Sequence, residues 1–131
     1  MSTAVLRRSL PAKRILIAED DPIVAETLRM ALVVDGHAVE TTEDGRHALA
    51  TFDPDKHDLV ITDFKMANMD GLELAQEIKK RSPSTPIILV TAYAEAIKGT
   101  GGTVSNVDIV LGKPWSVMEL QGALQRIFPT A

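Results

Sequence analysis

The stretch D-L-V-I-T-D, residues 58–63, decides how the rest of the chain is interpreted. Val60, Ile61 and Thr62 are apolar or β-branched residues of the kind that form buried strands, and they run directly into Asp63. A lone carboxylate at that depth is unfavourable unless it is paired, bound to a metal ion or used in a reaction. The remaining sequence should therefore supply groups that compensate or use Asp63.

Similar apolar runs recur along the chain and alternate with helical segments. The expected strands are residues 14–18, 37–41, 58–62, 86–91 and 107–111. The expected helical segments are residues 19–32, 44–52, 71–81 and 116–128. Strands that alternate with helices predict an α/β protein with a parallel sheet and helices on both faces.

Three of the helical segments carry signals for their N-terminal ends. Asp21 followed by Pro22 suits a capping residue and the first helical position. The spacing of a capping box occurs at Asp70 with Glu73 and at Ser116 with Glu119.

A fourth crossover helix is expected between residues 92 and 106, but its sequence is unfavourable. The stretch A-Y-A-E-A-I-K-G-T-G-G-T-V-S-N contains Gly99, Gly101 and Gly102. Each glycine destabilises a helix by roughly 1 kcal/mol relative to alanine. We expect a short or disordered helix that ends near Lys98, followed by a loop.

Length and composition indicate one globular domain. The chain has 131 residues, of which 45% are hydrophobic and 24% charged, with a net charge of −4 and no cysteine. We expect residues 1–12 to form a flexible arm and residues 13–131 the domain. The sequence has no apolar run suited to an export signal or a membrane span and no basic footprint for nucleic acid, so we expect a cytoplasmic protein without direct nucleic acid binding.

Chemistry-bearing residues follow four of the five expected strands. Glu19 and Asp20 follow the first strand, Asp63 the third, Thr91 the fourth and Lys113 the fifth. In open parallel sheets, ligands bind beyond the carboxyl ends of the strands. We therefore expect these five side chains to converge on one edge of the sheet.

Three neighbouring carboxylates need a cation. Two carboxylates about 4 Å apart repel by about 4 kcal/mol at an effective dielectric constant of 20. Lys113 can neutralise part of this charge, and a set of oxygen ligands without cysteine favours Mg²⁺ for the rest. A site with Mg²⁺, a lysine and a free carboxylate can transfer a phosphoryl group to an aspartate.

Together, these motifs resemble the receiver domain of bacterial two-component response regulators. They are E-D-D after the first strand, D-F-K-M-A-N-M-D-G after the third, T-A after the fourth and K-P after the fifth. The resemblance covers about residues 13–128. It implies a doubly wound, flavodoxin-like sheet of five strands in the order 2-1-3-4-5.

The resemblance also implies a role for each site residue. Asp63 would be the phosphoacceptor, and a histidine kinase or a histidine phosphotransfer protein would be the donor. Asp20 and Asp63 would ligate Mg²⁺ directly, Glu19 would act through water, and the main-chain carbonyl of Lys65 would complete the protein ligands.

The remaining roles concern catalysis and output. Lys113 would pair with a phosphoryl oxygen, and its bond to Pro114 would be cis. Thr91 would move its hydroxyl onto the phosphoryl group and shift the domain toward a conformer read by an unknown downstream protein. Such a domain is not an enzyme, apart from limited self-phosphorylation and self-dephosphorylation.

The chain departs from the family pattern in its output region. Val110 stands where most members have Tyr or Phe, and Ala67 replaces a common proline in the loop after Asp63. The glycines at 99–102 weaken the helix that the family uses in its output face. We therefore expect the signal to leave through another face or through order gained in residues 94–106.

Two alternatives remain open at this point. A pseudo-receiver would bind partners without phosphorylation. A phosphatase with an aspartate nucleophile would also place a carboxylate at a strand end, although Phe64 and Lys65 after Asp63 leave it no second carboxylate as general acid.

Side chains away from the acidic edge are given simpler interpretations. The histidines at 37, 47 and 57 are expected to be solvated surface residues rather than metal ligands. Trp115 is expected to be a partly buried core residue.

Overall fold

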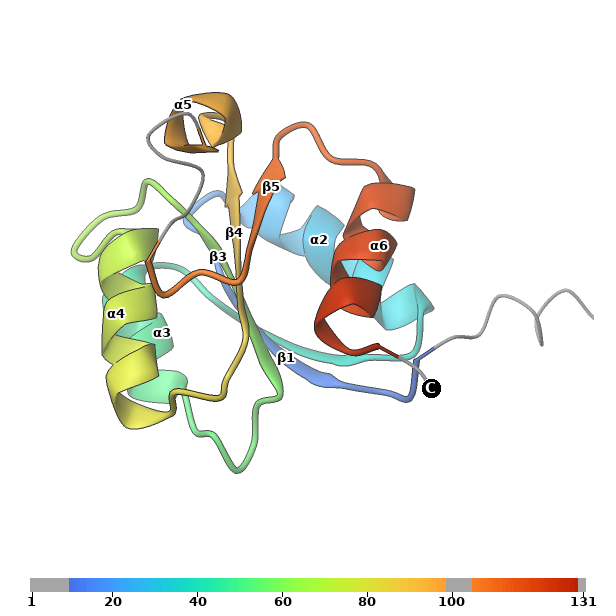
Figure 1. Ribbon diagram of the computed structural model, residues 1–131, viewed down its shortest axis with the longest axis horizontal. Coiled ribbons are helices and arrows are strands. Elements are labelled where there is room, and N and C mark those ends of the chain that lie inside the picture. Colours follow the sequence, from blue (N-terminus) through green and yellow to red (C-terminus); the bar gives the residue numbers. More distant parts are fainter. Residues whose placement is uncertain (1–9, 99–104, 130–131) are drawn as a thin grey trace, which may run out of the picture.

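A computed structural model describes residues 10–98 and 105–129 of the chain (Figure 1). The strands are β1 (Arg14–Ala18), β2 (Ala38–Thr42), β3 (Leu59–Asp63), β4 (Ile87–Thr91) and β5 (Ile109–Gly112). The helices are α2 (Pro22–Val34), α3 (Gly45–Thr51), α4 (Gly71–Arg81), α5 (Ala94–Lys98) and α6 (Val117–Ile127). The expected alternation of strands and helices is confirmed.

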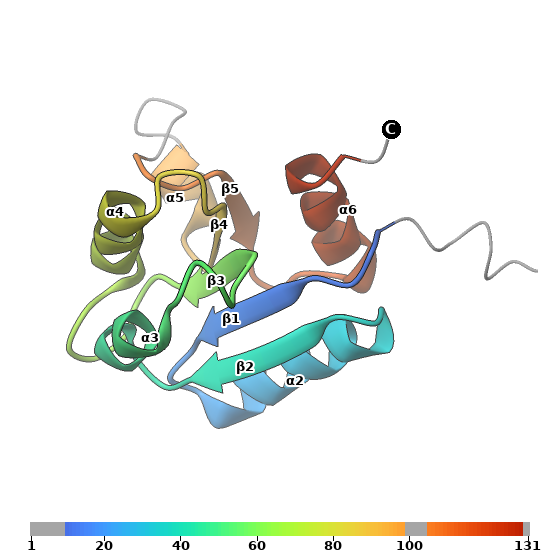
Figure 2. The same cartoon turned by 90° about the horizontal axis from the view of Figure 1, so that it is seen from below.

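The five strands form one parallel sheet in the order β2-β1-β3-β4-β5. Figure 2 shows β2, β1 and β3 side by side and pointing the same way. Strands β2 and β3 are consecutive in the chain but lie on opposite sides of β1, so the connection between them crosses β1. The strand order implied by the resemblance is confirmed.

Two apolar layers cover the sheet. On one face, Leu28 and Leu32 of α2 and Leu120 and Leu124 of α6 pack with alternate residues of the inner strands. On the other face, α3 and α4 contribute Ala48, Leu74 and Ile78. Figure 1 shows these helix pairs on opposite sides of the sheet.

Strands β3 and β4 are buried on both faces, as their continuous apolar sequences require. The central strands therefore form a rigid base for the residues at their carboxyl ends.

The predicted helix caps are confirmed. The Asp21 carboxylate accepts hydrogen bonds from the backbone N–H groups of Ile23 and Val24. Asp70 with Glu73 and Ser116 with Glu119 form complete capping boxes.

The first turns of α2 and α6 each expose an apolar residue. Ile23 and Val117 are 76% and 50% exposed. Neither residue belongs to the buried core, so the apolar residues of each helix continue past the part that the sheet covers.

The helix between β4 and β5 is short, as expected. It ends at Lys98, directly before Gly99. Gly99, Gly101 and Gly102, on which the prediction rested, lie outside the described residues. Strand β5 begins later than expected, at Ile109, and the carboxylate of the preceding Asp108 accepts the backbone N–H of Ile87 at 2.8 Å.

The interpretation of the histidines is wrong for two of the three. His47 is exposed, but His37 and His57 are each only 6% exposed. Their Nδ1 atoms accept backbone N–H groups, from Lys13 at 2.9 Å and from Asp53 at 3.1 Å. Each ring replaces a missing backbone acceptor near the amino edge of the sheet, and this use of a histidine leaves no periodic signal in the sequence.

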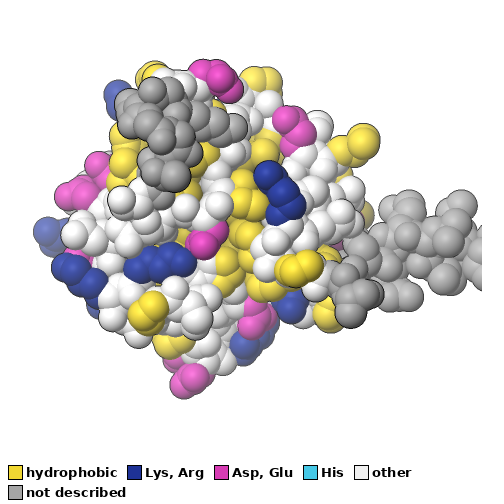
Figure 3. Space-filling model, in the orientation of Figure 1, with side chains coloured by type: hydrophobic (Ala, Val, Ile, Leu, Met, Phe, Trp, Pro, Cys, Tyr) yellow, Lys and Arg dark blue, Asp and Glu magenta, His cyan; other side chains and the backbone are white. Residues whose placement is uncertain are grey.

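The surface of the domain has mixed charge. Acidic and basic side chains are interspersed over the face in Figure 3.

Trp115 is partly buried and packs against the α2–α6 layer, as expected. Among the described residues, no helix has the length and apolar character needed to span a bilayer.

Candidate phosphoacceptor site

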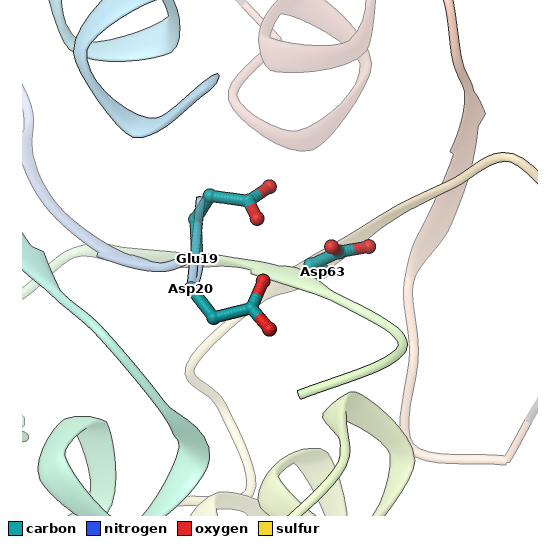
Figure 4. A group of neighbouring side chains, drawn as sticks. All are labelled: Glu19, Asp20 and Asp63. Atoms are coloured by element: carbon teal, nitrogen blue, oxygen red, sulfur yellow. The ribbon is translucent and has the colours of Figure 1, made fainter. Parts of the chain in front are cut away.

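The carboxyl ends of β1 and β3 bring three carboxylates together. Glu19 and Asp20 directly follow β1, and Asp63 is the last residue of the adjacent β3. Oxygen atoms from the three carboxylates lie within 4.8 Å of one another. Figure 4 shows these side chains turned toward a common space. The convergence predicted from the strand ends is therefore observed for these three carboxylates.

Lys113 is the cation of this cluster. Its Nζ atom lies 3.3 Å from Oε1 of Glu19 and 3.2 Å from Oδ2 of Asp63. The lysine follows β5 directly, and its peptide bond to Pro114 is cis, as expected. One ammonium thus contacts two carboxylates, which leaves the cluster with surplus negative charge.

The Asp63 side chain is held by both of its oxygens. Oδ1 accepts the backbone N–H of Phe64 at 2.8 Å, and Oδ2 accepts from Lys113. The side chain is 13% exposed, so solvent reaches it only partly. The carboxylate is oriented by these bonds but remains accessible.

Gly71 supports Asp63 from behind. An added Cβ atom at Gly71 would overlap the backbone oxygen of Asp63, so only glycine fits there. The N–H of Gly71 also donates to the Phe64 carbonyl at 2.8 Å. Gly71 was not predicted as part of the site; its signal in the sequence is a glycine directly after the capping residue Asp70.

Burial changes the acidity of Glu19. The pKa of the Glu19 carboxyl is raised to about 7, chiefly by desolvation and also by the negative charge of Asp63, while hydrogen bonds from the Asp21 N–H and from Lys113 oppose the increase. The pKa of the Lys113 ammonium is raised, since attraction to Asp63 and Glu19 outweighs desolvation, the largest single effect. The electrostatics of the site thus favour an added cation.

Thr91 is the last residue of β4, and Lys65 follows Asp63 by two residues. Thr91 is 1% exposed, and its hydroxyl oxygen accepts the backbone N–H of Tyr93 at 3.0 Å. The Lys65 ammonium does not point into the acidic cluster: it lies 5.3 Å from the centre of the Tyr93 ring. This placement fits the expectation that the backbone of Lys65, rather than its side chain, contributes to the site.

An open cleft of about 420 Å³ borders the cluster. Its lining residues are Asp20, Phe64, Lys65, Met66 and Asp70. The loop between β3 and α4 therefore forms one wall of the cleft, and Asp20 lies on the other side. The arrangement can hold a cation together with a small anionic group beside Asp63.

Comparisons with known proteins agree on one family. The family model for the response regulator receiver domain matches residues 15–125. The transcriptional regulatory protein TcrA of Mycobacterium tuberculosis is 33% identical over 114 residues, which are 87% of this chain and 45% of that protein. The response regulator MprA of Mycolicibacterium vanbaalenii is also 33% identical, over 87% of this chain and 49% of that protein. The chain thus spans about half the length of the curated relatives it matches.

Solved structures lead to the same conclusion. The response regulator TrrA of Thermotoga maritima, in complex with Mg²⁺ and BeF, is 34% identical with a TM-score of 0.79 over 88% of this chain and 98% of that one. The receiver domain of the sensor histidine kinase PA1611 of Pseudomonas aeruginosa, with a magnesium ion in its active-site cleft, is 26% identical with a TM-score of 0.81 over 92% of this chain and 100% of that one. By its matched residues, its fold and these relatives, the chain belongs to the receiver domain family of two-component response regulators.

Proposed function

We propose that Asp63 is the phosphoacceptor of this receiver domain. The observation that carries the proposal is the position of Lys113, whose ammonium contacts Asp63 and Glu19 at the edge where three carboxylates meet. A lysine so placed can neutralise an oxygen of an incoming phosphoryl group while Asp63 reacts.

The reaction is a transfer between two nucleophiles. An Asp63 carboxylate oxygen attacks the phosphorus of a phosphohistidine, the bond from phosphorus to the imidazole nitrogen breaks, and the imidazole keeps that electron pair. The product is an acyl phosphate on Asp63. The Phe64 N–H on Oδ1 holds the carboxylate in one orientation, so less freedom is lost when the donor arrives.

The residues present fit Mg²⁺. The donor set consists of carboxylates from Glu19, Asp20 and Asp63 with at least one oxygen each within 4.8 Å of the others, and Mg²⁺ prefers such oxygen ligands. We propose that Asp20, Asp63 and the Lys65 carbonyl would hold the ion directly and that Glu19 would act through water. When bound, Mg²⁺ supplies positive charge that offsets the charge of the phosphoryl oxygens.

Thr91 links the site to the rest of the domain. Its hydroxyl accepts the N–H of Tyr93 and can donate its own proton to a phosphoryl oxygen. If this hydroxyl moved toward the phosphoryl group, the Tyr93 N–H would lose its hydrogen-bond acceptor. Tyr93 directly precedes α5, so the loss would affect the start of that helix. We propose that this coupling biases the conformer that a downstream protein reads, in place of an aromatic residue at the Val110 position.

The partners follow from this chemistry. A histidine kinase or a phosphotransfer protein in the cytoplasm would be the donor, and an unknown protein would receive the signal. This domain would not bind nucleic acid itself, and its own activity would be limited to self-phosphorylation and self-dephosphorylation. The family match argues against the phosphatase, and the cluster of Glu19, Asp20, Asp63 and Lys113 argues against the pseudo-receiver.

Intact-mass spectrometry after incubation with Mg²⁺ and acetyl phosphate tests the proposal. Wild-type protein should gain one phosphoryl group, and Asp63→Asn should gain none. Asp58→Asn is the matched control, since it makes the same change at the opposite edge of the sheet, and it should be labelled like wild type. Equal labelling of the Asp63→Asn variant would overturn the assignment.

A further inference from the structure

The loop of residues 64–70 is fixed at both of its ends. It forms a wall of the cleft through Phe64, Lys65 and Met66. At its start, Phe64 bonds to the Asp63 side chain, and at its end Gly71 bonds to the Phe64 carbonyl. The conformation of the middle of the loop therefore decides where the Lys65 segment lies relative to Asp20.

The middle of this loop holds a strained turn. Asn68 has φ of 71°, a left-handed conformation that non-glycine residues seldom adopt. The N–H of Met69 donates to the carbonyl of Ala67 at 2.8 Å, which closes a three-residue turn centred on Asn68. A γ-turn of positive φ is rare and strained, and such strain persists only where surrounding contacts impose it.

The N-terminus of α3 supplies those contacts. The Nδ2 atom of Asn68 donates to Oδ2 of Asp44 at 3.0 Å. Asp44 is also the cap of α3, and its Oδ1 accepts the N–H of His47 at 2.7 Å. These bonds hold the pKa of the Asp44 carboxyl below its usual range, with the His47 bond as the largest cause.

A second contact lies next to the first. A Cβ atom added at Gly45 would overlap the carbonyl oxygen of Met69, so the loop rests directly on the backbone of α3. The side-chain bond of Asn68 and the close approach at Gly45 hold the strained turn from two directions. Both contacts act on the loop that walls the cleft.

We propose that Asn68 is a positioning residue of the phosphoacceptor site. Through its bond to Asp44 it keeps the loop, and with it the Lys65 backbone, in the position that binding of Mg²⁺ beside Asp20 and Asp63 requires. This inference rests on the proposed function, because the ion and the role of Asp63 belong to that proposal. It adds a residue that touches neither the ion nor the phosphoryl group.

Titration calorimetry with Mg²⁺ alone tests the role of Asn68 without any measurement of phosphorylation. Asn68→Gly tolerates the positive φ but removes the side-chain bond, and it should weaken Mg²⁺ binding about fivefold, the equivalent of one hydrogen bond. Asn68→Asp places a second carboxylate against Asp44 and should also weaken binding. The added negative charge alone would strengthen Mg²⁺ binding. Weaker binding by this variant would therefore show that the displaced loop, and not the added charge, determines the change in affinity.

The exchanged pair Asp44→Asn with Asn68→Asp is the decisive variant. The amide introduced at position 44 can accept from His47 through its oxygen and donate through its nitrogen to the carboxylate introduced at position 68, so the bond returns with its direction reversed. The net charge equals that of wild type. Mg²⁺ affinity should return to within about twofold of wild type.

Thermal unfolding in EDTA supplies the second readout. If the single variants lose metal-free stability but keep wild-type Mg²⁺ affinity, Asn68 has a structural role only and the inference is overturned. Failure of the exchanged pair to recover affinity would overturn it as well. If wild type itself binds no Mg²⁺, the proposed function fails with it, whereas wild-type binding with unchanged variants contradicts this inference alone.

Discussion

The two edges of the sheet treat their charges in opposite ways. At the amino edge, two acids each pair with one cation, and a third acid accepts a hydrogen bond from a histidine. The ion pairs are Arg14–Asp58 and Lys79–Asp108, at 3.0 and 2.9 Å, and Nε2 of His57 donates to Glu40 at 3.0 Å. Two of these acids also accept backbone N–H groups, from Arg14 and from Ile87, at the start of strands.

At the carboxyl edge, the charges are not balanced. Glu19, Asp20 and Asp63 face one ammonium, that of Lys113. Like charges at this distance destabilise the folded state, and a group is kept in such surroundings where a ligand or a reaction uses it. Carboxylates at the amino edge therefore stabilise the fold. Those at the carboxyl edge destabilise it, but they form the candidate phosphoacceptor site.

The largest effect is expected from the backbone beneath the carboxyl edge. Gly71→Ala places a Cβ atom on the Asp63 carbonyl oxygen, so β3 or α4 must shift. We expect a loss of about 3 kcal/mol in the free energy of unfolding and loss of phosphorylation. Urea denaturation and labelling with acetyl phosphate measure the two effects.

Gly122→Ala in α6 is the matched control. An added Cβ there has no atom within 4 Å, so the same change should stabilise the protein by about 0.5–1 kcal/mol through helix propensity. Similar effects of the two variants would show that the approach of Gly71 to Asp63 is unimportant.

Much of this architecture could be predicted from the sequence, because its signals are local. The alternation of apolar runs with capped helices predicts the parallel sheet, and the strand ends at Asp20, Asp63 and Lys113 predict which edge carries the site. In a parallel sheet, the carboxyl ends of all strands lie at the same edge. Residues that follow different strands in the sequence therefore lie close together in the fold.

The contacts that could not be predicted join distant segments without any periodic pattern. His57 as an acceptor for Asp53, Gly71 behind Asp63 and the bond from Asn68 to Asp44 depend on the detailed approach of loops. A glycine or asparagine in a loop is too common to indicate such a contact alone. The sequence shows that the loop exists, and only the packed structure shows what it rests on.

The next effect concerns an acid of the amino edge. Asp58→Ala removes the acceptor for the backbone N–H, Nε and Nη2 of Arg14. We expect a loss of about 2 kcal/mol near neutral pH. Urea denaturation of both proteins from pH 3 to pH 8 measures it.

The pH dependence of this loss has a definite sign. The side-chain bond from Arg14 holds the pKa of Asp58 below its ordinary value of 3.8. A carboxyl with a lowered pKa stabilises the fold above the unfolded value and loses that contribution as the pH falls through the folded value. The difference between wild type and Asp58→Ala should therefore shrink below that ordinary value, and a difference that grew on acidification would contradict the pairing.

The smallest effect should have the opposite sign, at the carboxyl edge. The pKa of Glu19 is raised from 4.5 to about 7, chiefly by burial. Between these values the folded state binds a proton that the unfolded state has lost, so metal-free protein should lose stability as the pH rises through this window. Glu19→Gln removes the charge and keeps one of the two acceptor oxygens used by Lys113 and Asp21, and it should raise metal-free stability by about 1 kcal/mol at pH 8. Urea denaturation in EDTA at pH 5 and pH 8 checks this, because the gain should be smaller at pH 5, where folded Glu19 is already protonated. A loss of stability at pH 8 would place Glu19 with the amino-edge acids and remove the contrast between the two edges.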